Sequence, residues 1–216
     1  MSRSQGEVIS VNIVHAVIAG PSRMTGIDKR PVSGRVGLGR TGLAGDVQCD
    51  TRFHGGPDKA LYAYACEDAY FWAAELGRSI PAGLFGENLT LRRVDVTGAV
   101  IGERWRIGDD VLVEVRMPRS PCANLAHRMG IPKFHHRFDA SGRTGAYLSV
   151  LESGSIGAGD TVTVENRPGH GVTVADCTGR PRVAPMRRLL AGGTDLAEEV
   201  RSMAERILAR AQKRRC

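Results

Sequence analysis

Several features that would assign this chain to a common class are missing from it. No apolar run approaches the roughly 18 residues that span a membrane, and the N-terminus lacks a secretory hydrophobic region. The five cysteines are odd in number, widely spaced and free of C-x-x-C pairs, which argues against a disulfide framework and against a zinc knuckle. We therefore expect a soluble cytoplasmic protein with reduced thiols and no membrane partner.

Aromatic side chains are also scarce, at 5% of the residues, whereas the net charge is +7. Excess positive charge favours an anionic partner, which leaves open nucleic acid, a phosphate-bearing cofactor or an acidic protein. Proteins that bind single-stranded nucleic acid combine basic with aromatic side chains, and that combination is lacking around the basic residues 213–215. We therefore do not expect nucleic acid to be the partner.

What the sequence does contain is glycine and alternating apolar residues. Twenty-seven glycines in 216 residues are typical of turn-rich β structure. Strands are predicted at residues 7–18, 60–64, 100–106, 111–116 and 161–165. Residues 67–76 are predicted to form a helix that ends at Gly77, with its aromatic side chains in the core. Residues 20–34 are expected to form a polar connection.

The pattern becomes helical after residues 166–171. Pro185 precedes one short amphipathic stretch, and a second stretch begins near Asp195. Asp195 and Glu198 have the spacing of a capping box, which predicts the N-terminus of a helix at this point. The C-terminal part is therefore expected to be helical.

The strongest chemical signal is residues 117–124 (MPRSPCAN), directly after a predicted strand. Pro118 and Pro121 stiffen the backbone on either side of Arg119, so the loop holds Cys122 in a defined direction. A nearby guanidinium favours the thiolate and lowers a cysteine pKa from its free value of about 8.5. Thiolate is also the form that binds soft metals. An ordinary buried cysteine is the alternative.

Two glycine-containing segments give weaker signals. Residues 53–62 (FHGGPDKALY) place His54 and Lys59 on either side of a Gly-Gly-Pro turn, where both could face one ligand. A hairpin with solvated ends explains the same residues. The glycines of residues 39–45 predict either tight turning between strands or backbone N–H groups near an anion.

Taken together, five patterns resemble the MOSC family, the molybdenum-cofactor sulfurase C-terminal domain, and most of all its YiiM-like branch. They are GLAGDVQ (residues 42–48), HGGPDKALYAY (54–64), FGENL (85–89), PRSPC (118–122) and RTGAYLSV (143–150). The resemblance implies a mainly β protein with a closed, mostly antiparallel barrel and a few short helices in residues 1–167. It implies a small helical C-terminal domain in residues 168–216.

The resemblance also implies a molybdenum-cofactor-dependent reductase of N-hydroxylated bases or amines. Cys122 would be the molybdenum ligand and a catalytic residue, and His54 a second catalytic residue that orients a neighbour or donates a proton. The remaining residues that the resemblance places at the molybdopterin-type cofactor are Arg119, Ser120, Asn124, Lys59, Gly55, Gly56, Asp46, Asn88 and Arg143. Cys49, Cys66, Cys177 and Cys216 have no comparable setting.

Reduction of N–OH needs two electrons and two protons, and ordinary side chains do not supply the electrons. The cysteine spacing does not match an iron–sulfur site, so we expect a redox partner protein as the electron donor. The substrate would be a small N-hydroxylated molecule. A homodimer and, by analogy, pyridoxal phosphate binding are left open. The alternative function is a carrier of sulfur or molybdenum cofactor that uses a persulfide on Cys122.

Overall fold

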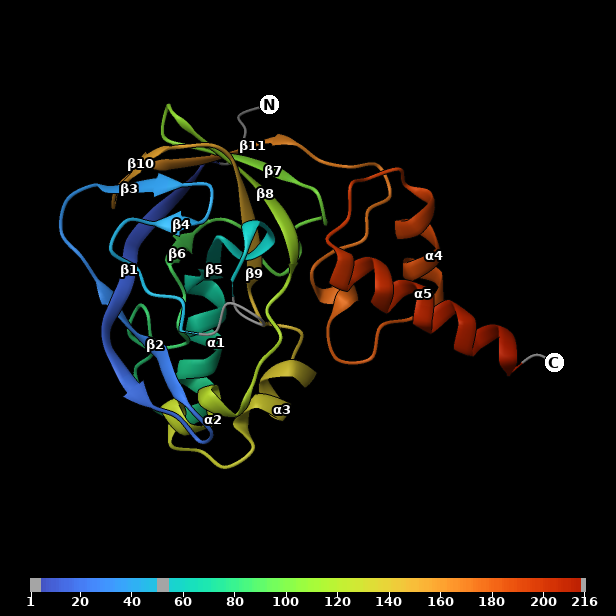
Figure 1. Ribbon diagram of the computed structural model, residues 1–216, viewed down its shortest axis with the longest axis horizontal. Coiled ribbons are helices and arrows are strands. Elements are labelled where there is room, and N and C mark those ends of the chain that lie inside the picture. The colour runs from blue at the N-terminus through green and yellow to red at the C-terminus, as the bar shows by residue number, and fades with distance from the viewer. Residues whose placement is uncertain (1–4, 50–54, 215–216) are drawn as a thin grey trace.

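The barrel is built around strand β1 (Gly6–Ala19), which pairs with three other strands in the computed structural model (Figure 1). The structure describes residues 5–49 and 55–214. The first half of β1 pairs with β6 on one side and β11 on the other, and the second half pairs with β2 (Met24–Pro31). Burial alternates along its first residues, as expected for a strand with one face on a core.

Seven strands close into the barrel in the order β11-β7-β8-β9-β5-β6-β1, with β1 returning to β11. They are β1, β5 (Leu61–Ala65), β6 (Leu89–Arg92), β7 (Arg104–Ile107), β8 (Val111–Pro118), β9 (Ala146–Glu152) and β11 (Thr161–Asn166). Strands β5 and β6 pair in parallel, and the other neighbours are antiparallel. The predicted fold class, a closed and mostly antiparallel barrel, is confirmed.

Two stretches that were expected to be irregular form strands. The polar residues 20–34 contain β2, which was missed because its polar side chains mask the alternation. The glycines of residues 37–42 match the spacing G-x-G-x-x-G, but they form the small sheet of β10 (Gly154–Ile156), β3 (Val36–Gly39) and β4 (Gly42–Leu43). Because no helix follows that hairpin directly, it is not a dinucleotide fingerprint.

Helix α1 (Cys66–Leu76) provides the crossover that the parallel β5–β6 pair requires. It ends at Gly77 in the left-handed conformation, as predicted. Of its three central aromatic residues, only Trp72 is buried, whereas Tyr70 is 67% exposed and Phe71 37%. The expectation that all three belong to the core was therefore wrong for two, because consecutive helical residues point in different directions.

The other helices lie at two places on the barrel (Figure 1). Helices α2 (Ala123–Met129) and α3 (Phe134–Ala140) lie together at one end, and α4 (Val183–Ala191) and α5 (Glu198–Lys213) form the tail. The short 3-10 helices are η1 (Pro57–Lys59) and η2 (Ala175–Cys177). Within the described ranges, no helix has the length and apolar character needed to cross a bilayer.

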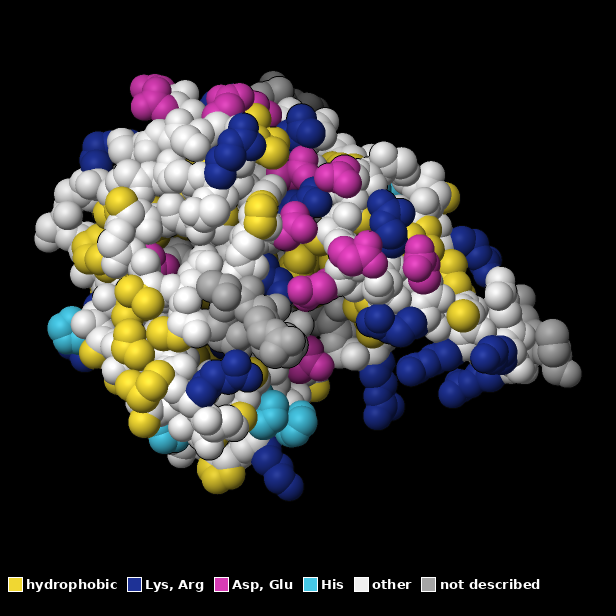
Figure 2. Space-filling model, in the orientation of Figure 1, with side chains coloured by type: hydrophobic (Ala, Val, Ile, Leu, Met, Phe, Trp, Pro, Cys, Tyr) yellow, Lys and Arg dark blue, Asp and Glu magenta, His cyan; other side chains and the backbone are white. Residues whose placement is uncertain are grey.

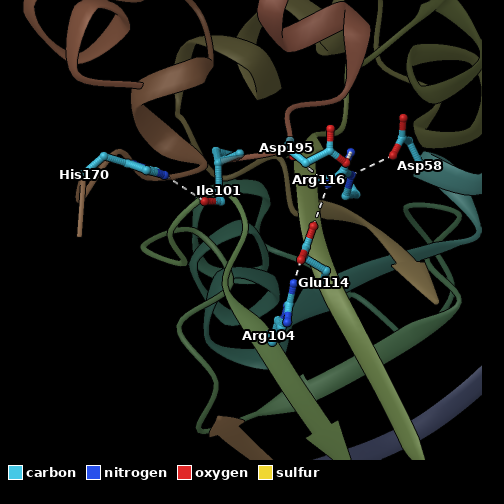
Figure 3. Close-up of polar contacts among 7 residues, drawn as sticks. All are labelled: Asp58, Ile101, Arg104, Glu114, Arg116, His170 and Asp195. Atoms are coloured by element: carbon cyan, nitrogen blue, oxygen red, sulfur yellow. Dashed lines mark hydrogen bonds and ion pairs between the residues drawn. The ribbon is translucent and has the colours of Figure 1, made fainter. Parts of the chain in front are cut away.

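Side chains and backbone of the tail contact the barrel through charged and polar groups (Figure 3). The buried Arg116 of β8 donates to Glu114 at 2.5 Å, to Asp58 at 2.6 Å and to the Asp195 carbonyl at 2.8 Å. Asp195 thus contacts Arg116 instead of capping α5, which begins after Ala197. The backbone N–H of Ile101 also donates to the Val172 carbonyl.

The apolar core is continuous across the expected domain boundary. Trp105 and Leu148 of the barrel and Val172, Met186 and Val200 of the tail belong to one cluster of buried residues. The division into residues 1–167 and 168–216 stays a prediction, and the shared cluster shows that the tail packs against the barrel.

The fold depends on close approach of the chain at Gly145. Its φ is +72°, and a Cβ there would lie 2.5 Å from the Ala63 carbonyl oxygen and 2.7 Å from the Tyr62 ring. Gly145→Ala should lower the free energy of unfolding by about 2 kcal/mol or more, from left-handed strain and overpacking. Gly77→Ala is the matched control, because φ there is also positive but no atom lies within 4 Å of the added Cβ. Urea unfolding of both variants tests this, and equal losses would contradict the steric explanation.

Candidate functional site

A cavity lies beside the segment that connects β8 to α2. Its walls come from β2, the residues after β4, η1, the start of β5, the turn before β6, and β9. The predicted site residues that line it are Asp46, Lys59, Asn88, Arg119, Cys122 and Asn124. The structure therefore gathers residues from distant parts of the sequence around one cavity.

The loop that carries Cys122 is fixed at both ends. Strand β8 continues through Pro118, and the Arg119 N–H donates to the Gly145 carbonyl at 3.2 Å. Cys122 is half-buried with extended backbone angles and stands at the N-cap of α2, where its carbonyl accepts from the Leu125 N–H at 3.0 Å. This is the stiff strand-end loop that the two prolines predict.

Arg119 carries its charge into this buried setting. The side chain is 5% exposed, and its guanidinium carbon lies 5.6 Å from the centre of the Tyr62 ring. Among the described residues, Nη1 of Arg119 is buried and finds no hydrogen-bond partner. Because a buried donor without a partner costs about 1–3 kcal/mol or more for a charged group, the position suits a ligand that supplies an acceptor.

Burial sets the charge of the groups around Arg119. Burial of the guanidinium opposes its charge, but Tyr62, Tyr147 and Cys122 raise the pKa of Arg119 above its ordinary value. Burial raises the pKa of Tyr62 and of Tyr147 as well, although Arg119 offsets part of this effect. Both phenols therefore stay protonated at neutral pH beside a permanent cation.

Asp46 and Asn88, which also line the cavity, form a polar network. Asp46 accepts from the Val14 N–H at 2.9 Å, from Asn88 Nδ2 at 2.8 Å and from the Lys29 ammonium. Asn88 also donates to the Asn12 carbonyl at 3.2 Å and accepts from the Tyr62 N–H at 3.1 Å. Both amide protons of Asn88 are thus already used within the protein. These two residues shape the cavity wall more than they offer bonds to a ligand.

Glu87 lies behind that wall, 3% exposed. It accepts from the N–H groups of Gly83 at 2.6 Å and Phe85 at 3.1 Å, and from the Thr90 hydroxyl at 3.1 Å. Burial raises the pKa of Glu87 from 4.5 to about 7, although these three bonds oppose the shift. Glu87 therefore holds the turn before β6, from which Phe85 and Gly86 face the cavity.

Other predicted site residues lie elsewhere. Arg143 pairs with Asp68 and lies 4.6 Å from the Phe71 ring centre, away from the residues that line the cavity. Ser120 is exposed and lines a separate cavity against α5. Gly55 and Gly56 belong to the turn before η1 and are not part of the cavity wall. His54 lies outside the described residues, so its catalytic role stays a prediction.

Sequence reasoning missed several residues of the cavity. Lys29 was missed together with β2, and burial lowers its pKa although Asp46 opposes this effect. Tyr62 and Tyr147 carried no signal beyond strand alternation. Cys49 was expected to have no special setting, but it lines the same cavity as Cys122 and is exposed. The sequence around Cys49 contains no chemical pattern that indicates this position.

Within residues 5–49 and 55–214, no three His, Cys, Asp or Glu side chains gather in a way that could hold a metal ion. Cys122 and Cys49 are the soft donors that line the cavity, together with cations, phenols and amides. Such a set fits a group that brings further metal ligands of its own.

Known proteins resemble this chain in sequence. The MOSC domain family model matches residues 50–163. The uncharacterized protein YflK of Bacillus subtilis is 38% identical over 150 residues, which are 69% of this chain and 67% of that protein. YiiM of Escherichia coli is 34% identical over 61% of this chain and 60% of its own length. A protein named reductase from Gibberella moniliformis is 34% identical over 66% of this chain, but this is only 26% of that protein.

The fold resembles solved structures over nearly the whole chain. The crystal structure of YiiM from Geobacillus stearothermophilus superimposes with a TM-score of 0.76 at 28% identity. The match covers 94% of this chain and 99% of the other, so it includes the helical tail as well as the barrel.

The buried Glu87 predicts a pH-dependent stability. Its carboxyl holds a proton more tightly in the folded chain, so its favourable contribution is present below about pH 4.5 and is lost as the pH rises through about 7. Relative to Glu87→Gln, the free energy of unfolding of the wild type should therefore fall across this window. The change is on the order of 3 kcal/mol, at about 1.4 kcal/mol per pKa unit.

Urea unfolding at several pH values between about 5 and 8 measures that difference. Glu205→Gln on the exposed face of α5 is the control with the same change of charge. A difference between wild type and Glu87→Gln that stays constant with pH would show that the carboxyl does not titrate in this range.

Arg119 is also expected to affect the ionisation of the Cys122 thiol. Because Arg119 and Cys122 interact electrostatically, loss of the guanidinium should make the Cys122 thiolate less favourable. Arg119→Ala should shift the titration of Cys122 to higher pH, whereas Arg119→Lys and Arg143→Ala should shift it less. The rate of reaction with a thiol probe is followed against pH in a background where Cys49 and Cys216 are serine. Superimposable curves for the Ala variant and its parent would limit Arg119 to ligand binding.

Proposed function

This chain belongs to the MOSC domain family, in its YiiM-like branch, and from that premise we propose that it is a molybdenum-cofactor-dependent oxidoreductase. MOSC domains in general bind the molybdenum cofactor. The proposed substrates are N-hydroxylated bases or amines, which are reduced from N–OH to N–H. The observation that carries the proposal is the Cys122 thiol beside the buried, unpartnered Nη1 of Arg119 in one cavity.

The side chains of the cavity fit such a cofactor. Cys122 would hold the molybdenum as its thiolate, because a soft donor is available there and no three-residue metal cluster exists within the described part of the chain. Arg119 and Lys59 would bind the anionic part of the cofactor, since charge-assisted hydrogen bonds to anions are the stronger ones. Asn124 lines the same wall and would add an amide hydrogen bond.

When bound, the cofactor supplies reversible two-electron chemistry. The reaction would be R–NH–OH + 2e⁻ + 2H⁺ → R–NH₂ + H₂O, with the electrons delivered by a partner protein. The protein's own groups would bind and orient the substrate. Tyr147 lines the cavity with a pKa that burial raises, so its protonated hydroxyl can donate a hydrogen bond to the substrate oxygen. Proton donation by His54 is part of the same proposal.

A second function is favoured by Cys49. It lines the cavity of Cys122, and two thiols at one site are what a sulfur carrier could use to pass a persulfide sulfur from one to the other. In that case Cys122 would carry sulfur, and the protein would transfer it without net substrate reduction. Cyanide reacts with a persulfide and releases thiocyanate. Release of thiocyanate from freshly purified wild-type protein, but not from Cys122→Ala, would favour the carrier.

The proposed function predicts the metal content of cysteine variants. Expressed in a host that makes the cofactor, Cys122→Ala should fold normally but contain less than about a tenth of the wild-type molybdenum and pterin, because the only proposed metal bond is lost. Molybdenum is measured by mass spectrometry and pterin by fluorescence after oxidation. Cys49→Ala and Cys177→Ala are controls from inside and outside the cavity, and both should retain the metal. Full molybdenum content in Cys122→Ala would remove the basis of the proposal.

A further inference from the structure

Two ion pairs connect α5 and the segment before it to the barrel, and one of them reaches the cavity. Asp195 contacts Arg116, with 3.4 Å between its carboxylate and the guanidinium, and Arg116 does not line the cavity. Glu199 contacts Lys59 at 2.5 Å, and Lys59 does line it. Acidic side chains gather along the line where barrel and tail meet, whereas the far part of the tail is basic (Figure 2).

The two partners of the cavity pair differ in exposure. The Lys59 side chain is 8% exposed and its ammonium lies 5.9 Å from the centre of the Tyr147 ring, whereas the Glu199 side chain is 60% exposed. If the pair separates, the Glu199 carboxylate can return to water, because its side chain is already largely exposed. The ammonium instead stays at the cavity wall, where it favours another anion.

Lys29, Arg119 and Lys59 are largely withdrawn from solvent, and their charges are neutralised in different ways. Lys29 is held by Asp46, whose side chain is 8% exposed and is fixed by bonds from Val14 and Asn88. Arg119 has an unpartnered Nη1. Lys59 has a carboxylate that is exposed and comes from the tail. Of these counter-ions, Glu199 is therefore the one that can be exchanged for a ligand.

A second cavity gives α5 room to move. It has a volume of about 410 Å³ and lies between the N-terminal half of α5 and the loop that carries Cys122. Ser120 and Met117 form its barrel side, and Glu199 and Met203 its helix side. The contact between α5 and the barrel is thus incompletely packed next to Glu199.

We propose that Glu199 is a displaceable counter-ion of Lys59, and that an anionic ligand of the phosphate class displaces it when it binds in the cavity. Binding of the anion and docking of α5 are then coupled, and the coupling acts in both directions. Glu199 is a positioning residue, because it acts on the ligand through Lys59. The inference rests on the proposed function only for the anionic character of the ligand. The ligand cavity has a volume of about 100 Å³, which is room for several water molecules or a small anion.

The test uses inorganic phosphate as the probe and the full-length protein without molybdenum, titrated at constant ionic strength and followed by NMR. Glu199→Gln should tighten phosphate binding roughly two- to fivefold, which corresponds to about 0.5–1 kcal/mol. Asp195→Asn is the matched control, because it removes the same charge from the other ion pair and should leave the affinity unchanged. In a Lys59→Gln background, Glu199→Gln should bring no gain.

Hydrogen exchange gives the second readout. Saturating phosphate should speed amide exchange in the first turns of α5 in the wild type, and should have no such effect in Glu199→Gln. The inference is overturned if Asp195→Asn tightens binding as much as Glu199→Gln, if the gain persists without Lys59, or if no variant binds phosphate saturably. The last result would leave the molybdenum content of the cysteine variants as an independent test of the proposed function.

Discussion

Strand β8 is buried from Val111 to Met117, and a strand covered on both faces must find a partner for every polar group that it carries. Glu114 and Arg116 satisfy this constraint together, with help from Arg104 on β7, from the Asp58 carboxylate of η1 and from the Asp195 carbonyl of the tail (Figure 3). Arg119, just beyond the strand, keeps a buried donor atom, Nη1, that has no partner in the described part of the chain. Arg116 therefore connects the strand to the tail, and Arg119, three residues further along the chain, brings positive charge to the cavity.

The family motifs contribute to the site in two different ways. PRSPC supplies side chains that face the cavity, and one of them, Arg119, has a donor atom without a partner among the described residues. FGENL and GLAGDVQ supply Glu87, Asn88 and Asp46, whose hydrogen bonds are satisfied by neighbouring segments. Some residues of a family motif therefore hold the walls of the site in place instead of contacting a ligand. Recognising the motif does not reveal which of its residues contact the ligand.

Much of the barrel could be predicted because its signals are local. Alternation in β1, β5 and β11 and the glycine after α1 follow from backbone geometry within a few residues. Strand β2 could not be found this way, since it pairs with the second half of β1 through a polar sequence. The loop of Cys122 was predictable from its prolines, whereas the positions of Cys49 and Glu199 beside it depend on contacts between segments far apart in the chain. Composition carries no information about such contacts.

The pairing of Gly6 with Val162 joins the two ends of the barrel. This makes barrel closure a late event, because a ribosome must have released the chain beyond Asn166 before β11 can reach β1. Until then β1 and β7 each present an unpaired edge. Contacts of such long sequence separation also slow folding. A nascent chain that still lacks β11 therefore exposes two open strand edges, which can pair with other chains unless a chaperone covers them.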